Sequence, residues 1–131
     1  MTAREASCVC GQLLVRVEGE PLMVSICCCF ACQRRTGSVA SVQGSFNTKQ
    51  VAVKGEERTY VRHTGAGEER TYHFCPTCGS TVFWEAPVEP GVTYVPVGAF
   101  ADPTFPAPTV SVWESRRHPW FHIPDGITSD A

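Results

Sequence analysis

The sequence lacks an excess of charge of either sign, a long apolar run and an internal repeat. Its 131 residues include 11 Lys and Arg against 13 Asp and Glu, which gives a formal net charge of -2. The basic residues occur as short pairs, Arg34 with Arg35 and Arg116 with Arg117, so a broad positive field for phosphate backbones is missing. A run of roughly 18 apolar residues, as a membrane-spanning helix requires, occurs nowhere. We therefore expect no nucleic acid and no membrane as partners.

An apolar segment of the signal-peptide type is also missing from the N-terminal stretch MTAREASCVCG. This absence leads us to expect a cytoplasmic protein. A reducing compartment favours metal binding or chemistry over disulfides for the eight cysteines. Because no shift in composition marks a boundary, we expect a single domain over residues 1–131.

Helical patterns are scarce, and the best is FACQRRTG, residues 30–37, about two turns ended by a glycine suited to a C-cap. The pattern Leu13-Leu14-Val15-Arg16-Val17 alternates with the period of a half-buried strand. The proline-rich ADPTFPAP, residues 101–108, indicates a loop. Short runs rich in Val, Thr, Tyr and Phe predict the other strands: QLLVRVEG, SVASVQGSF, VAVKG, RTYVRHTG, RTYHF, TVFWEA, VTYVPVGAF and TVSVW. We expect a mostly β fold with at most one or two short helices.

The most specific motif is FCPTCGS, which places Cys75 and Cys78 in the C-P-x-C-G pattern of a zinc knuckle. Proline and glycine favour the tight turn that brings two thiolates onto one ion. A closed structural zinc site needs four ligands. Cys8 and Cys10 precede Gly11 in a similar turn, so we assign Cys8, Cys10, Cys75 and Cys78 to one structural site. Two alternatives stay open: thiols without metal, and a pairing of Cys75 and Cys78 with the central cysteines.

The central cysteines lie in SICCCFACQRRTG, residues 25–37. In an extended segment residues 27 and 29 project to one side and 28 to the other. The spacing therefore predicts that Cys27, Cys29 and Cys32 converge while Cys28 points away. Three protein ligands and an open position are typical of a catalytic zinc. The alternative is that all four thiols close a second structural site.

Three thiolates make zinc a poor Lewis acid for water, and an incoming thiol suits the open position better. Arg34 and Arg35 follow the ligands directly and can balance negative charge or bind carboxylates. Of the four histidines, His118 in RRHPW is the best candidate for a pocket, whereas His73 beside FCPTC is expected to have a packing or surface role. Arg34, Arg35 and His118 are thus the predicted substrate-binding residues.

The motifs resemble those of the glutathione-dependent formaldehyde-activating (GFA) enzymes and their centromere-protein-V-like relatives. The similarity covers nearly the whole chain in the family's order: CVCGQLLVRVEG, CCCFACQRRTGS, FCPTCGSTVFW, VPVGAFADP and RRHPWFHIPDG. It implies a β-tent fold, with a structural zinc on Cys8, Cys10, Cys75 and Cys78 and a catalytic-type zinc on Cys27, Cys29 and Cys32.

The resemblance also implies a reaction, the addition of glutathione to formaldehyde, which is classed with carbon-sulfur lyases. One departure is Cys28, which stands where many members place a histidine or another polar residue. This change could alter which thiols coordinate, or add an oxidisable thiol. Two other readings remain: a non-catalytic scaffold with two structural zinc sites, and a methionine-sulfoxide reductase with Cys28 as its redox thiol.

Overall fold

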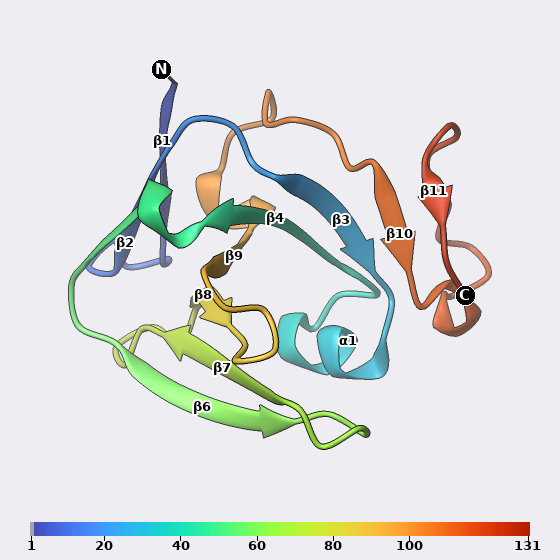
Figure 1. Cartoon of the computed structure of the whole chain (residues 1–131), viewed down its shortest axis with the longest axis horizontal. Helices are drawn as coiled ribbons and strands as arrows, with labels where there is room; N and C mark the ends of the chain where they lie inside the picture. The colour runs from blue at the N-terminus through green and yellow to red at the C-terminus, as the bar shows by residue number, and fades with distance from the viewer. Residues whose placement is uncertain (1) are drawn as a thin grey trace.

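The computed structural model describes residues 2–131, which hold eleven strands, one α-helix and three 3-10 turns (Figure 1). The elements in chain order are β1 (Ala3–Ser7), β2 (Leu14–Glu18), β3 (Met23–Cys27), α1 (Phe30–Thr36), β4 (Ser41–Asn47), η1 (Thr48–Gln50), β5 (Val51–Lys54), β6 (Arg58–His63), β7 (Glu69–Phe74), β8 (Thr81–Glu85), β9 (Val92–Pro96), η2 (Val97–Phe100), β10 (Val110–Val112), η3 (Glu114–Arg116) and β11 (Thr128–Ser129). The predicted mostly β fold with one short α-helix is confirmed.

The strands form two sheets. Three of them pair in the order β1-β2-β5, and the other eight in the order β11-β10-β3-β4-β9-β8-β7-β6. Most neighbours are antiparallel, but β10 runs parallel to both β3 and β11. Short sheets joined by cysteine-bearing turns give the β-tent architecture expected from the sequence.

Eight strands coincide with the predicted runs, and β1, β3 and β11 do not. The sequence of β1 is AREAS, whose residues have little intrinsic preference for strands. Pairing with β2, in which Ala6 lies opposite Val15, imposes the extended conformation. The neighbouring strand thus overrides local preference in β1.

The core lies where the small sheet packs against the large one. Leu13, Val15 and Val17 are fully buried, which confirms the alternation predicted for this strand. They belong to one cluster with Phe46 and Phe100. The proline-rich segment is a loop, as predicted, and it contributes Phe105, whose ring stacks on Phe100 with a centroid separation of 4.7 Å.

Helix α1 begins and ends as its sequence predicts. Cys29 is the N-cap, and its sulfur accepts a hydrogen bond from the Cys32 amide. Gly37 ends the helix, where its amide donates to the Gln33 carbonyl. Figure 1 shows α1 in the opening between β3 and β4 on one side and β6 and β7 on the other. The short helix therefore lies between two parts of the large sheet, β3–β4 and β6–β7.

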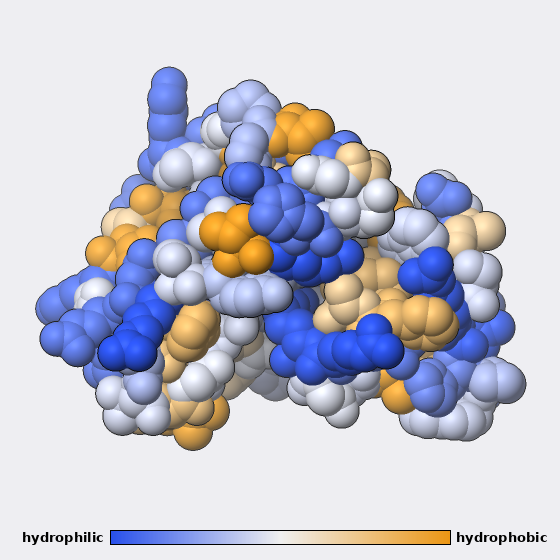
Figure 2. Space-filling view, turned by 90° about the horizontal axis from the view of Figure 1, so that it is seen from below, coloured by the Kyte–Doolittle hydropathy of each residue, from blue (hydrophilic) through white to orange (hydrophobic). Residues whose placement is uncertain are grey.

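No helix in the described part of the chain is long and apolar enough to cross a membrane. On the face seen from below, Figure 2 shows hydrophobic residues interrupted by strongly hydrophilic ones.

Candidate metal centres and the adjoining cavity

The cysteines of the two outer motifs come together at one point. The sulfurs of Cys8, Cys10, Cys75 and Cys78 all lie within 4.8 Å of one another. The separations Cys8–Cys10 and Cys10–Cys75 are both 3.6 Å. A tetrahedral zinc with bonds of about 2.3 Å would require sulfur separations of about 3.8 Å. Four thiols at this spacing fit a closed structural zinc site.

Backbone amides around this cluster point at the sulfurs. The Leu13 amide donates to Cys8 Sγ, and the Thr77 amide donates to Cys75 Sγ, both at 3.3 Å. Hydrogen bonds from Ser80 lower the pKa of Cys78 to about 5. Burial acts to raise the pKa of Cys75, but the hydrogen bond from Gln12 and those from backbone amides lower it. The surroundings of Cys75 and Cys78 thus favour thiolates, the form that binds a metal. The Gln12 amide acts to lower the pKa of Cys10, but burial and the neighbouring cysteines raise it to about 11.

Gln12 connects this cluster to the turn before β6. Its side-chain nitrogen donates to Cys75 Sγ at 3.0 Å and to the Glu56 carbonyl at 2.8 Å. Its oxygen accepts from the Glu56 amide at 2.9 Å. The sequence motifs do not reveal this role, because Gln12 lies 63 residues from Cys75 along the chain.

The central cysteines form a second cluster. Cys27 ends β3, Cys29 caps α1 and Cys32 lies in the first turn of that helix, and their sulfurs lie within 4.8 Å of one another. Sulfur–sulfur hydrogen bonds lower the pKa of Cys29 and raise that of Cys27. The amide of Cys32 also donates to Cys29 Sγ at 3.3 Å. Three thiols that share protons at this distance fit a soft metal ion such as zinc, which would be held by three protein ligands.

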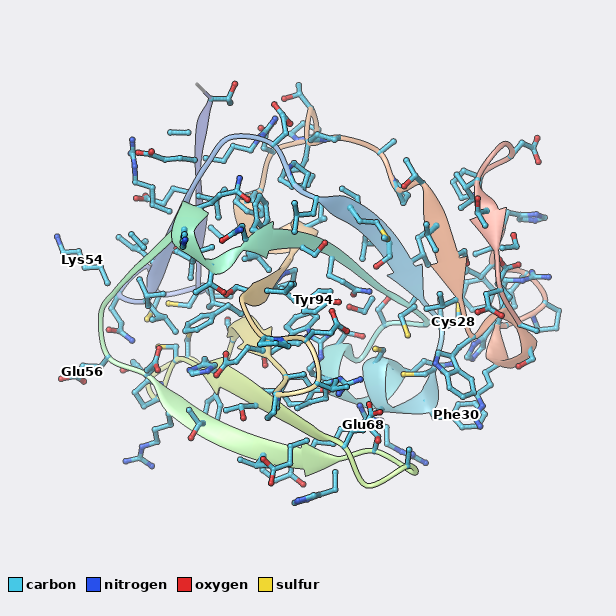
Figure 3. All side chains as sticks on the ribbon, in the orientation of Figure 1. Cys28, Phe30, Lys54, Glu56, Glu68 and Tyr94 are labelled. Atoms are coloured by element: carbon cyan, nitrogen blue, oxygen red, sulfur yellow. The ribbon has the colours of Figure 1, made fainter. Side chains whose placement is uncertain are left out.

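Cys28 lies outside both clusters of sulfur ligands. Its side chain is fully buried, and burial together with nearby Glu114 raises its pKa. Its amide donates to the Val112 carbonyl of β10. In Figure 3, Cys28 and Glu56, the residue bonded to Gln12, lie on opposite sides of the centre along the long axis. The two cysteine clusters are therefore separate centres.

The three-cysteine cluster opens into a cavity of about 710 Å³. Four arginines line it, Arg35, Arg62, Arg70 and Arg116. Its lining also includes Ser25, Gln43, Tyr72, Trp84, Tyr94 and Trp113. Glu68 and Glu89 also line the cavity, and Arg70 pairs with Glu68 at 3.3 Å. Four arginines against two glutamates leave an excess of positive charge, which together with the aromatic walls suits an anionic ligand of small-molecule size.

Arg35 is the member of the predicted arginine pair that reaches the cavity. Its Nη2 donates to Ser41 Oγ at 2.7 Å, and its guanidinium lies 4.3 Å from the centroid of the Trp84 ring. The Nε atom is buried and has no hydrogen-bond partner within residues 2–131. A buried cationic donor without a partner is costly unless a ligand accepts from it.

The other two predicted substrate-binding residues lie elsewhere. Arg34 is exposed on α1, and neither it nor His118 belongs to the described lining of the cavity. His118 packs against Trp120, with ring centroids 5.5 Å apart. The helix places adjacent arginines on different faces, so only one of the pair can face the cluster.

Arg62, Arg70 and Arg116 were missed by sequence reasoning. Burial acts to lower the pKa of Arg62, but Tyr72, Cys29 and Cys32 raise it. Arg116 lies between two rings, 4.7 Å from the centroid of Phe30 and 4.6 Å from that of Trp113. The alternation in RTYVRH predicts a strand, but the side of that strand that faces the cysteines depends on the folding of the sheet.

A second cavity, of about 620 Å³, is lined by His73, Glu57 and Glu85. The two ring nitrogens of His73 contact Glu57 at 2.8 Å and Glu85 at 2.7 Å, and the ring stacks on Phe83. Because the carboxylates meet opposite nitrogens, they do not converge on one point as metal ligands would. The structural role expected for His73 agrees with these contacts.

Most of the chain matches a known protein family. The model of the family described as glutathione-dependent formaldehyde-activating enzyme matches residues 3–116. The chain belongs to this family. Within the GFA match lie both cysteine clusters and the four cavity arginines.

The GFA fold of the chain is also similar to a solved structure. A crystal structure of a Rhodobacter sphaeroides protein superposes with a TM-score of 0.56 and 23% sequence identity, over 72% of this chain and 85% of that chain. At this identity the likeness shows the fold alone. No curated protein matches the sequence significantly.

Proposed function

We propose that this chain binds a thiol such as glutathione at the three-cysteine centre and adds it to a small aldehyde such as formaldehyde. The reaction is of the carbon-sulfur lyase class. The observation that carries the proposal is the convergence of Cys27, Cys29 and Cys32 on a cavity that also holds four arginines.

Cys27, Cys29 and Cys32 would hold the catalytic-type zinc, and Cys8, Cys10, Cys75 and Cys78 the structural one. A bound zinc supplies positive charge and a fourth position, which together favour the thiolate form of an incoming thiol near neutral pH. Arg35 and Arg62 lie close enough to the cysteines to offset the negative charge that a fourth thiolate adds. Arg35 belongs to the adjacent pair expected from the sequence, and Arg62 comes from β6.

Glutathione carries two carboxylates, which suit the planar donors of arginine. Arg35 offers a buried Nε that has no partner in the described chain, and Arg116 is held between two aromatic rings. The aromatic residues Tyr72 and Trp84 exclude water from one side of Arg35. These contacts orient the thiol and bring its sulfur close to the aldehyde carbon.

In the reaction the thiol loses its proton to water and its sulfur forms a bond to the carbonyl carbon. The π pair of the carbonyl moves to oxygen, and water returns a proton to that oxygen. Thiol and aldehyde together give one hydroxyalkyl thioether, with no oxidant or reductant. Orientation supplies most of the acceleration, because the same addition proceeds in water.

The proposal is tested with purified zinc-loaded protein in two steps. Calorimetric titration with glutathione should show one binding site per chain, and S-methylglutathione, which has no free thiol, should bind at least about 10-fold more weakly. Isotope-labelled formaldehyde is then added, and the signal of S-hydroxymethylglutathione is followed by NMR. Its formation should be faster than in protein-free buffer.

Two zinc ions per chain with no binding of glutathione would overturn the proposal and favour a scaffold with two structural sites. Equal affinity for glutathione and S-methylglutathione would also contradict it, because the free thiol would then make no contribution.

A further inference from the structure

Four side chains form a continuous chain of hydrogen bonds beside the cavity, and three of them line it. Arg35 Nη2 donates to Ser41 Oγ at 2.7 Å, and Ser41 Oγ donates to Gln43 Oε1 at 2.7 Å. Gln43 Nε2 donates to Ser25 Oγ at 3.0 Å. Ser41 and Gln43 are 2% and 7% exposed, so water hardly competes for these bonds. We call this set of four residues the relay.

The register of β3 and β4 places the relay beside the cysteine cluster. Ser25 lies opposite Gln43, and Cys27 lies opposite Ser41. Ser25 and Cys27 are two residues apart on one strand, so their side chains project from the same face. Both line the cavity, together with Gln43 and Arg35.

The chemistry of the donors fixes the direction of the relay. A guanidinium has donors only, so Ser41 must accept from Arg35. The buried Ser41 hydroxyl then needs an acceptor for its own proton, and Gln43 Oε1 is the one that the described residues supply. This contact turns the amide nitrogen of Gln43 toward Ser25. Every link therefore points away from the cation and toward the cavity.

Ser25 is the last residue of the relay, and its hydroxyl proton has no acceptor within the described residues. Its oxygen accepts from Gln43, and no hydrogen bond from its hydroxyl to an acceptor is formed among residues 2–131. Hydrogen bonds arranged head to tail polarise one another, and a cation at the start strengthens the last donor. The cavity thus holds a polarised hydroxyl donor on the same strand face as Cys27.

We propose that the Ser25 hydroxyl binds the carbonyl oxygen of the aldehyde and stabilises the negative charge that this oxygen gains as the sulfur adds to carbon. Ser25 is then a catalytic residue, and Gln43, Ser41 and Arg35 are positioning residues that act through it. A donor aimed at a developing oxyanion is a strong source of transition-state stabilisation. The inference rests on the proposed function, since it assigns a role within the same addition.

The first test compares Ser25→Ala, Gln43→Met and the double variant in zinc-loaded protein. Ser25→Ala should lower the catalysed rate of adduct formation from glutathione and formaldehyde about 100-fold, the cost of one oxyanion donor. Gln43→Met leaves the hydroxyl in place without its polarising partner, so about a 10-fold loss is expected. The double variant should be no slower than Ser25→Ala, because both substitutions act on the same hydrogen bond, the one donated by the Ser25 hydroxyl. The affinity for glutathione should stay within about twofold in all three.

Ser45→Ala is the matched control. Ser45 lies on β4, is buried like Ser41 and Gln43, and donates to the Met23 carbonyl outside the relay. Its variant should keep the wild-type rate. If Ser25→Ala and Ser45→Ala are equally active, the proposal is overturned.

A second readout does not depend on catalysis. S-(2-hydroxyethyl)glutathione and S-propylglutathione have nearly the same size and differ by a hydroxyl group in place of a methyl group, one carbon farther from sulfur than the oxygen of the adduct. Wild-type protein should prefer the hydroxyl compound by about 2- to 10-fold more than Ser25→Ala does, the worth of one hydrogen bond. An unchanged preference in Ser25→Ala would overturn the role of Ser25, even if the adduct forms. If wild-type protein binds neither compound nor glutathione, the proposed function itself fails and the relay proposal falls with it.

Discussion

The eight thiols of this chain differ in what surrounds each sulfur. Four lie within 4.8 Å of one another, and two of these, Cys8 and Cys75, accept backbone amide hydrogen bonds. Three others converge in the lining of a cavity, and Cys28 is buried apart from both sets. Substitutions of neighbouring cysteines therefore affect different sites. The same holds for the arginines, because Arg34 and Arg35 are adjacent in sequence and only Arg35 faces the cluster.

Cys78→Ser and Cys29→Ser should have different effects on stability. Cys78 belongs to the site that ties the turn after β1 to the turn between β7 and β8. Its loss should lower the melting temperature by more than about 10 °C, since metal binding at a structural site contributes folding free energy. Cys29→Ser should change the melting temperature by less than about 4 °C and remove one metal per chain. Thermal unfolding and metal analysis distinguish the two, and an equal collapse would contradict the division into structural and catalytic-type sites.

Arg35→Met and Arg34→Met are a matched pair for thiol binding. Arg35 lies over Trp84 with an unpartnered, buried Nε within the described residues, whereas Arg34 is exposed. Arg35→Met should raise the dissociation constant of glutathione about 10-fold, which corresponds to about 1.4 kcal/mol. Arg34→Met should change it less than about twofold. Calorimetric titration measures both, and similar losses would show a field effect of net charge instead of a specific contact.

At the scale of elements, hydrogen bonds hold the turn between β5 and β6 against the segment that follows Cys8 and Cys10. Gln12 makes two hydrogen bonds with the backbone of Glu56 and one with Cys75. The backbone of Gly55 lies so close to that of Gln12 that a Cβ atom on Gly55 would be 2.0 Å from the Gln12 carbonyl oxygen. Gly55 also has a φ of +113°, a conformation that favours glycine. The packing of this turn therefore depends on a residue without a side chain.

Gly55→Ala should destabilise the domain by about 3 kcal/mol, because the backbone must shift to relieve the overlap. Gly65→Ala is the control: a Cβ there would meet no heavy atom within 4 Å, and its effect should stay within about 0.5 kcal/mol. Urea denaturation measures both free energies of unfolding. A Gly55→Ala variant as stable as Gly65→Ala would mean that this contact does not constrain the turn.

At the scale of the whole molecule, a stack of side chains connects α1 with the centre of the large sheet. Arg35 lies over Trp84, and Trp84 stacks on Tyr94 with rings 5.9 Å apart and 8° from parallel. Tyr94 donates to Glu89, and Figure 3 shows Tyr94 in the middle of the molecule. Burial, followed by the hydrogen bond with Glu89, raises the pKa of Tyr94 above its ordinary value near 10.

This raised pKa predicts loss of stability in alkali. Above pH 10 the Tyr94 phenol ionises readily in the unfolded chain but stays protonated in the folded one, so the unfolded state binds fewer protons and stability falls as pH rises. The free energy of unfolding of Tyr94→Phe should fall less between pH 8 and pH 11 than that of the wild-type protein. These pH values bracket the ordinary tyrosine titration near 10. Urea denaturation at both pH values checks this, and identical slopes in the two proteins would contradict it.

Both cysteine groups are readable from sequence because the physics is local. The C-P-x-C-G turn, the period of two around Cys28 and the glycine after α1 each involve neighbouring residues. The sequence did not predict the roles of Arg62 and Arg70, because the side of a strand that faces a site depends on how the strand pairs. It did not predict that of Gln12, because its partners Glu56 and Cys75 are distant in sequence. His118 and Arg34 were placed by proximity in sequence, and the structure positions them outside the described cavity lining.

The sequence by itself determined the mostly β class, the short helix and the two cysteine sets, since periodicity, turn chemistry and ligand spacing act over a few residues. Only the tertiary structure decided which cations meet the three-cysteine centre, because β6, β7 and η3 reach it from distant parts of the chain. It also decided the relay, whose four residues come from β3, β4 and α1. Their contacts depend on strand register, and the long-range pairing that sets this register is formed only when the sheet folds.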